Sequence, residues 1–147
     1  MRQIYSPNEN TIVTTNGKGS FIIACHNYKR LTYRYIVKPE DEIQIEELND
    51  LYEDSNSLRL KIQISHVPEG RYLLKSYYVN QNNGSVQDIW MQMGGMKSLS
   101  SQEIDYLQKI SIPHVEMVTL QTADGVLEIE TSLLQHEIKI IEVQYQY

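Results

Sequence analysis

Histidines are the residues that most readily combine metal binding with acid–base chemistry, and this chain has four: His26, His66, His114 and His136. They stand 40, 48 and 22 residues apart. A single helix or short loop presents two metal ligands only when these lie about four residues apart. No pair has that spacing, so we expect ordinary strand and loop histidines and no metal site. The alternative is that some of them meet in space after folding.

The single cysteine, Cys25, closes an apolar run at residues 21–25, which predicts a small core residue. A reactive thiol would need an electropositive and partly exposed position. A lone cysteine excludes an internal disulfide and fits a reducing, cytoplasmic setting. The chain contains no Gly-x-Ser-x-Gly turn, phosphate-binding loop or dinucleotide fingerprint. We therefore expect no catalytic residue, no cofactor and no metal.

Carboxylates are concentrated in the acidic segment, residues 40–54, which holds eight acids and no lysine or arginine. A pair of carboxylates is all that glycoside hydrolysis requires, provided that burial in a cleft raises the pKa of one of them. Dense acidic runs are normally solvated, so we expect this one to lie on the surface. An enzyme acting through the run is the alternative. Outside it, 13 basic residues nearly balance 11 acidic ones.

A basic stretch just before the acidic segment is the nearest thing to a nucleic-acid contact. Its residues are Lys29, Arg30, Arg34 and Lys38, interleaved with Tyr28, Tyr33 and Tyr35. Four cations beside eight acids are expected to pair with those acids rather than with phosphates, so we expect no direct nucleic-acid contact. The longest apolar runs have five residues, whereas a membrane span needs about 20, so we expect no membrane partner either.

The elements that must position these residues are mostly strands, in a chain long enough, at 147 residues, for one packed domain. Leu58, Leu60, Ile62 and Ile64 alternate with polar residues, which predicts a strand with one buried face. Further strands are predicted at 11–15, 20–26, 72–79, 115–122, 126–131 and 137–143, with turns at 16–19 and 124–125. Short strands without alternating helices predict an antiparallel β-sandwich of about seven or eight strands.

Two short helices interrupt the strands. Ser85 is expected to cap a helix over residues 86–93, which Gly94 ends in the left-handed conformation. Ser100 and Glu103 form the pattern of a capping box at the start of a second helix. A third helical segment is predicted at 44–52. We expect these four capping residues, together with Trp90, to act as structural anchors.

Trp90 lies on the first of these helices, which is too short to be stable in water without burying a large side chain. We therefore expect Trp90 to be mostly buried against the sandwich, beside Ile89 or Met93. The alternative is an independent carbohydrate-binding module, in which Trp90 and some of the eleven tyrosines stack on a sugar.

Several segments carry a resemblance to a known family. They are the Gly-Arg-Tyr strand at 70–79, the helix ending Trp-Met-Gln-Met-Gly at 90–94, the Ser-Ser-Gln-Glu helix start at 100–103, the hairpin through Gly125 and, more loosely, the strand ending His26-Asn27-Tyr28. Together they resemble the C-terminal β-sandwich region of glycoside hydrolase family 39, the β-xylosidase family. The resemblance covers residues 10–28 loosely and 57–143 more closely, and residues 29–56 have no counterpart. A similar barrel-plus-sandwich region is appended to some large AraC-type transcription regulators of Gram-positive bacteria.

This resemblance implies a sandwich without its own active site. The catalytic glutamates of family 39 belong to a TIM barrel, and the Asn-Glu-Pro signature of its acid/base is not matched, because Asn10 follows Asn8-Glu9. We expect residues 1–147 to form one accessory domain, as a fragment of a larger protein. Its partner would be the glycosidase-like barrel of that parent, either an AraC-type regulator or a β-xylosidase-like protein. A sugar ligand is the further possibility.

Overall fold

The fold is described from a computed structural model, which covers residues 3–33, 37, 39, 42 and 44–147. Within these residues, the elements with defined bounds are eight strands, the α-helices α2 and α3, and the 3₁₀ helix η2. The strands are β1 (Gln3–Asn8), β2 (Thr11–Thr15), β3 (Ser20–His26), β4 (Leu58–Ser65), β5 (Arg71–Val79), β6 (His114–Gln121), β7 (Val126–Leu133) and β8 (Ile138–Gln146). The helices are η2 (Ile45–Leu51), α2 (Val86–Gln92) and α3 (Ser101–Ile110).

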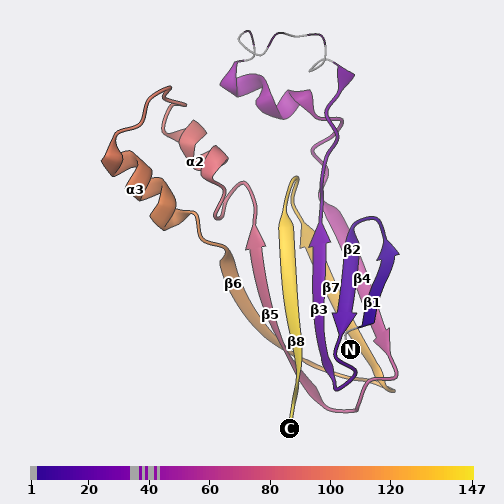
Figure 1. The fold of residues 1–147 in the computed structure, drawn as a ribbon. Helices are drawn as coiled ribbons and strands as arrows, with labels where there is room; N and C mark the ends of the chain where they lie inside the picture. Colours follow the sequence, from indigo (N-terminus) through magenta and orange to yellow (C-terminus); the bar gives the residue numbers. More distant parts are fainter. Residues whose placement is uncertain (1–2, 34–36, 38, 40–41, 43) are drawn as a thin grey trace.

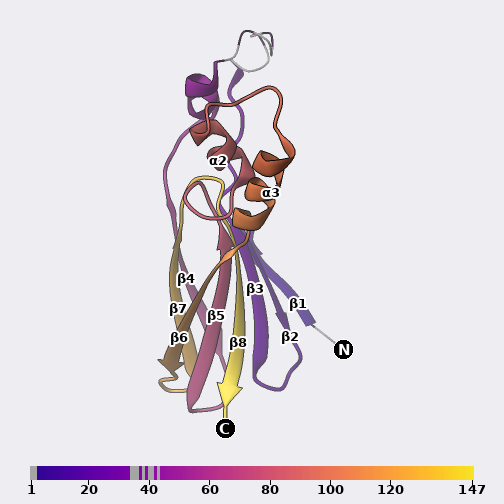
Figure 2. The same cartoon turned by 90° about the vertical axis from the view of Figure 1, so that its left-hand side faces the viewer.

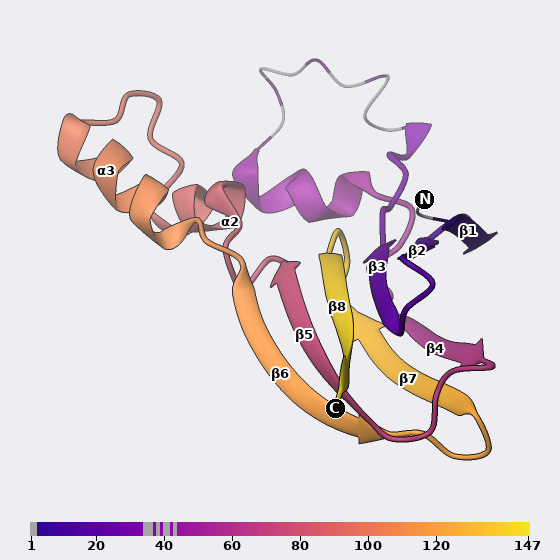
Figure 3. The same ribbon diagram turned by 60° about the horizontal axis from the view of Figure 1, so that its bottom comes forward.

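The strands form two sheets, and each strand pair is antiparallel. The larger sheet has the order β1-β2-β3-β8-β5-β6, and β4 pairs with β7 in the smaller one. Figure 1 shows the long strands lying side by side along a common axis, and Figure 3 shows the β4–β7 pair as a separate layer beside the larger sheet. The predicted antiparallel β-sandwich is thereby confirmed.

The core lies between the two sheets. Its buried residues are Val13, Ile23, Val67, Tyr72, Leu74, Leu127, Ile129, Ile141 and Val143. In β8 the buried positions are every second residue from Lys139 to Val143, as a strand with one inward face requires. Removing these side chains from water provides most of the stabilisation of the sandwich.

β4 shows the predicted alternation, but its inward residues are only half-buried. Every second residue from Leu58 to Ile64 is partly buried, and the residues between them are exposed. A groove of about 810 Å³ separates β4 from the β1–β2 hairpin, and Leu60, Ile62, Ile64 and Phe21 line it. The inward face of β4 is therefore only partly covered.

Two turns follow the sequence prediction closely. Asp124 and Gly125 both have positive φ, 53° and 70°, and Ala123 and Val126 exchange backbone hydrogen bonds around them. A turn with positive φ at both central residues favours an Asp-Gly pair, because these two residue types tolerate the left-handed conformation. In the first turn, the Asn16 side chain accepts hydrogen bonds from the backbone N–H groups of Lys18 and Ser20.

β1 is the strand that the sequence analysis did not predict. It contains Pro7 and has no alternation of apolar and polar residues. Proline is compatible with a strand only at an edge or an irregularity, and β1 is an edge strand whose register with β2 shifts between Tyr5 and Asn8. Tertiary pairing, rather than local sequence, determines this strand.

The helix ends agree with the predicted caps. Ser85 accepts a hydrogen bond from the Asp88 N–H, and Ser100 and Glu103 form the full capping box. Gly94, with φ 93°, follows α2, and two backbone bonds (Gly94 N–H to Met91 O, Gly95 N–H to Trp90 O) complete a Schellman motif. The helix predicted at 44–52 forms as the 3₁₀ helix η2. None of the helices in the described residues has the length and apolar character of a membrane span.

Candidate functional site

The helices lie beyond one end of the strands, not across either sheet (Figures 1 and 2). α2 packs on α3. Trp90 is partly buried, and its indole N–H donates a 3.0 Å hydrogen bond to the Met96 carbonyl in the following loop. Trp90 is therefore only partly buried and not mostly buried as expected: no residue of α2 is fully buried, and this helix packs on α3. Ser85, Gly94, Ser100 and Glu103 hold the ends of these two helices, and their role as anchors stays a prediction.

The groups considered for chemistry do not assemble into one centre. Among the described residues, no three His, Cys, Asp or Glu side chains gather in the manner of a metal site. His66 and His114 are exposed, on separate elements. Cys25 is buried, and desolvation raises the pKa of its thiol to about 11, so the thiol is protonated and unreactive at neutral pH.

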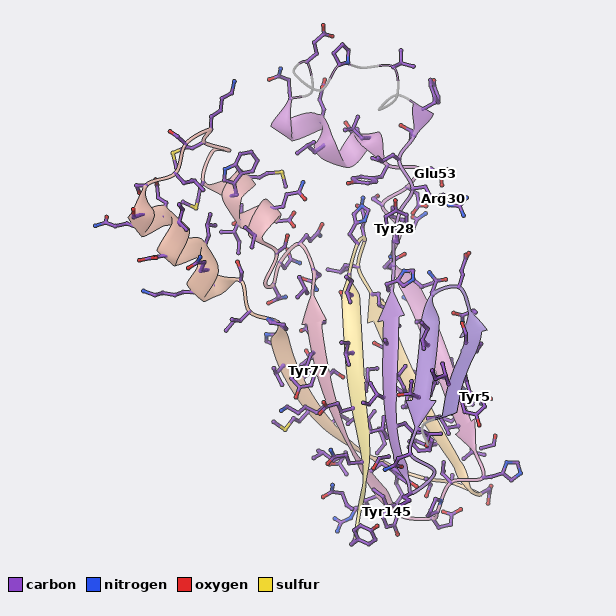
Figure 4. All side chains as sticks on the ribbon, viewed as in Figure 1. Tyr5, Tyr28, Arg30, Glu53, Tyr77 and Tyr145 are labelled. Atoms are coloured by element: carbon purple, nitrogen blue, oxygen red, sulfur yellow. The ribbon has the colours of Figure 1, made fainter. Side chains whose placement is uncertain are left out.

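The acidic segment is largely exposed where the structure describes it. Glu42, Asp50, Glu53 and Asp54 are exposed, while Glu40 and Asp41 lie outside the described residues. Lys29 forms a 2.6 Å ion pair with Asp54, which together with the Asn56 N–H lowers the pKa of that carboxyl. Of the four cations proposed to pair with this segment, Lys29 does so, and Arg34 and Lys38 lie outside the described residues. Figure 4 shows Arg30 and Glu53 near each other, and the backbone N–H of Glu53 donates to the Arg30 carbonyl.

A further candidate surface is the outer face, which is the side of the six-stranded sheet turned away from β4 and β7. One row of directly paired residues crosses five strands on this face: Ile12, Ala24, Ile140, Tyr77 and Val115. All five are apolar or aromatic, yet Ile12, Ile140 and Val115 are 49, 42 and 43% exposed. A continuous apolar row of this kind on a sheet normally lies against another layer.

A polar cluster on the outer face lies beside that row. Glu142 and Lys75 are paired in the register of β8 and β5. The Tyr77 hydroxyl lies 3.5 Å from Glu142 Oε2, and Lys75 Nζ lies 4.8 Å from the Tyr77 ring centre. Lys75 has a raised pKa, because it interacts with Tyr77 and Glu142. Toward the helices, the face continues into a groove of about 440 Å³ with Ile12, Ala24 and Ile138 in its wall.

A buried polar cluster lies where the strands end beneath the helices. Glu137 is 2% exposed and Lys139 8% exposed, and Lys139 Nζ lies 3.1 Å from Glu137 Oε1. The second Glu137 oxygen accepts hydrogen bonds from Asn80 Nδ2 at 2.9 Å and from the Leu134 N–H at 3.1 Å. The pair is thus neutralised and hydrogen-bonded, which a buried ion pair requires.

The rest of this cluster consists mostly of hydrogen bonds to backbone carbonyls. The Asn27 amide, 3% exposed, donates to the carbonyls of Asn56, Leu133 and Leu134. Lys139 donates to Thr131 Oγ1 and the Ser132 carbonyl. Asn27 belongs to the His-Asn-Tyr stretch of the family resemblance, which is the only sequence signal for the cluster. No sequence pattern indicated that Glu137 and Lys139 are buried, because charged residues that alternate with isoleucine normally face water.

The fold is shared with one region of larger glycosidases. The structure of a family 39 enzyme from Xanthomonas axonopodis pv. citri matches with a TM-score of 0.64 at 14% identity, covering 95% of this chain and 26% of that enzyme. A monomeric β-xylosidase from Caulobacter crescentus CB15 matches with 0.61 at 13% identity, covering 93% of this chain and 28% of that one. The resemblance to family 39 is therefore confirmed for the fold.

In sequence, the chain is similar to HTH-type transcriptional regulators of Staphylococcus aureus. The regulator of strain COL is 24% identical over 85 residues, which are 58% of this chain and 11% of the regulator. That of strain N315 is 22% identical over the same length. The chain thus spans about a tenth of these regulators and about a quarter of the glycosidases. No family model matches the chain.

Proposed function

We propose that this chain is a non-catalytic β-sandwich accessory domain, and that its outer face packs on a glycosidase-like barrel within a larger protein. The observation that carries this proposal is the apolar row from Ile12 to Val115, which five strands present together and which no described helix covers. Burying such a row is favourable at roughly 25 cal/mol per Å² of apolar surface.

The neighbouring polar group suits an interdomain contact. Such contacts combine an apolar centre with polar residues that fix the orientation of the two domains. Lys75, Tyr77 and Glu142 already interact beside the row. The likeness to HTH-type regulators supports a cytoplasmic AraC-type regulator as the parent protein. The likeness to β-xylosidases supports a glycosidase-like barrel as the adjoining domain.

The interdomain contact can be tested by charge substitution in the complete reading frame that contains this chain. Ile140→Glu should increase amide hydrogen exchange in β3 and β8 of the long protein, because water then enters the contact. In the isolated chain, the same change should alter the unfolding free energy by only about 0.5 kcal/mol or less, as an exposed position should. Arg59→Glu, on the outward side of β4, is the matched control. Equal exchange of the outer face in the isolated and complete proteins would refute the contact.

The lack of catalysis has its own test. The isolated chain should not hydrolyse aryl β-xylosides, because this chemistry requires two carboxylates held in a cleft. Turnover that disappears when an acid between residues 40 and 54 is substituted would contradict the accessory-domain function.

The alternative of an independent carbohydrate-binding module that uses exposed aromatic side chains has less support. The labelled tyrosines Tyr5, Tyr28, Tyr77 and Tyr145 lie at four separate places in Figure 4, so they do not form one platform. The Trp90 N–H is already bonded within its loop. A saturable change in Trp90 fluorescence with xylo-oligosaccharides would favour that alternative instead.

A further inference from the structure

A third hollow, the upper cavity, lies between the strand ends and the helices. Its volume is about 320 Å³, and four separate parts of the chain line it: the end of η2, the turn after β5, the start of α2 and the turn between β7 and β8. Small-molecule sites range from roughly 300 to 1,000 Å³, so this cavity suits a ligand of monosaccharide size rather than an oligomer. It is separate from the outer face.

The β7–β8 turn supplies a positioned imidazole to this cavity. His136 has a positive φ of 57°, and its backbone N–H donates to the Asn27 carbonyl at 2.9 Å. Its ring meets the Tyr52 ring edge-on, with centres 4.2 Å apart. Gln135 Nε2 lies 3.3 Å from His136 Nε2, and Gln135 is 8% exposed. With the amide as donor, the proton of the neutral imidazole resides on Nδ1.

Burial lowers the pKa of His136, with a further lowering by Lys29 and an opposing effect of the Asp88 carboxylate. The imidazole is therefore neutral at physiological pH, and with Nε2 accepting from Gln135 its Nδ1–H is the group that can donate a hydrogen bond. A neutral histidine does not attract anions, so phosphates and carboxylates are poor candidates for this cavity.

The opposite wall carries hydrogen-bonding groups with spare capacity. Asp88 lines the cavity, and one of its oxygens accepts the Ser85 hydroxyl, which leaves the other available. Gln81 and Gln87 also line it, and neither makes a side-chain hydrogen bond within the described part of the chain. Two amides, one carboxylate, a neutral imidazole and a tyrosine ring together match the alternating hydroxyl groups and C–H faces of a polyol.

We propose that the upper cavity binds a small neutral polyhydroxylated molecule of monosaccharide size, with Asp88 as a hydrogen-bond acceptor and His136 and the glutamines as its other polar contacts. This site involves neither Trp90 nor the outer face. It is independent of the proposed packing on a barrel, so Ile140→Glu should leave ligand binding unchanged.

The test is an NMR titration of the whole chain with D-xylose, L-arabinose and D-glucose, and with choline as a cationic probe. At least one sugar should cause saturable shifts confined to the amides of Tyr52, of residues 80–88 and of Gln135 and His136. Choline should cause none. The absence of saturable shifts with all three sugars, shifts centred on Trp90, or binding of choline alone would each overturn the proposal.

Substitutions then locate the contacts. Asp88→Asn keeps the side-chain size and should weaken sugar binding about tenfold, because a neutral hydrogen bond replaces one to a charged acceptor. Gln87→Ala is exposed and should weaken binding about threefold without affecting the fold, which circular dichroism checks. Gln102→Ala on α3, also exposed, is its matched control and should bind as the unchanged chain does. Unchanged affinity in both cavity variants would contradict the assignment.

Discussion

Gly70 lies directly beneath the ring of Tyr145. A Cβ atom at Gly70 would be 2.8 Å from both Cε2 and the hydroxyl oxygen of Tyr145, closer than van der Waals contact allows. The ring cannot move away freely, because its hydroxyl donates a 3.0 Å hydrogen bond to the Glu69 carbonyl and its edge packs on Tyr72. Tyr72 is fully buried and donates to the Pro68 carbonyl. In the Gly-Arg-Tyr sequence, the glycine thus leaves room for the Tyr145 ring, and the tyrosine, Tyr72, packs against that ring.

Gly70→Ala should therefore destabilise the chain by more than an ordinary left-handed glycine replacement. Gly17→Ala is the control, since Gly17 has φ 72° and open space around it, and it should cost about 1–2 kcal/mol. Urea unfolding measures both. In a Tyr145→Ala background the cost of Gly70→Ala should fall, leaving the backbone cost of its φ of 147°. Equal costs in the two backgrounds would show that the ring is not the obstacle.

Glu137→Gln should destabilise the sandwich strongly. It leaves the buried Lys139 ammonium without a counter-ion, and breaking a buried pair in this way costs about 3–5 kcal/mol. The double variant Glu137→Gln, Lys139→Met should recover part of that loss, because no charge is then left buried. Equilibrium unfolding in urea gives both values. A loss below about 1 kcal/mol for Glu137→Gln would mean that water reaches the pair.

Ile62→Ala should cost about 2 kcal/mol, at the lower end of the range for such truncations, because the groove beside β4 leaves this side chain half-buried. Lys61→Ala on the opposite face should change the unfolding free energy by about 0.5 kcal/mol or less. Lys61 Nζ lies 3.3 Å from Glu128 Oε2, but an exposed ion pair of this kind contributes little to stability. Urea midpoints of the two variants provide the comparison. A larger loss for Lys61→Ala would reverse the assignment of the two faces.

Cys25 should resist thiol reagents in the folded chain at about pH 8, because burial raises its pKa to about 11 and keeps the thiol protonated. The unfolded chain ionises this group near its ordinary value of 9.0. The associated stability is therefore complete below that pH and is lost as the pH rises toward 11. Labelling with a disulfide reagent, with and without urea, measures how far folding protects the Cys25 thiol. Rapid labelling of the folded chain would be the contrary result.

Local signals in the sequence were sufficient for several elements. The alternation in β4, the Asp-Gly turn before β7 and the caps at Ser85 and Ser100 all depend on neighbours within a few residues. Strand alternation, a left-handed turn and a capping hydroxyl each depend on short-range interactions. They can therefore be predicted from the residues alone.

Only the tertiary structure decided which face of β8 is covered and where Trp90 lies. Glu137, just before β8, and Lys139, within it, are buried, while Ile138 and Ile140 are exposed, the reverse of what polarity alone predicts. The inversion is stable because Asn80, which follows β5, and Thr131 and the Ser132 carbonyl, on β7, complete the hydrogen bonds of the buried charges. Trp90 lies in the α2–α3 pair because the chain carries both helices beyond the strand ends. Such compensation depends on residues far apart in the sequence, and no local pattern encodes it.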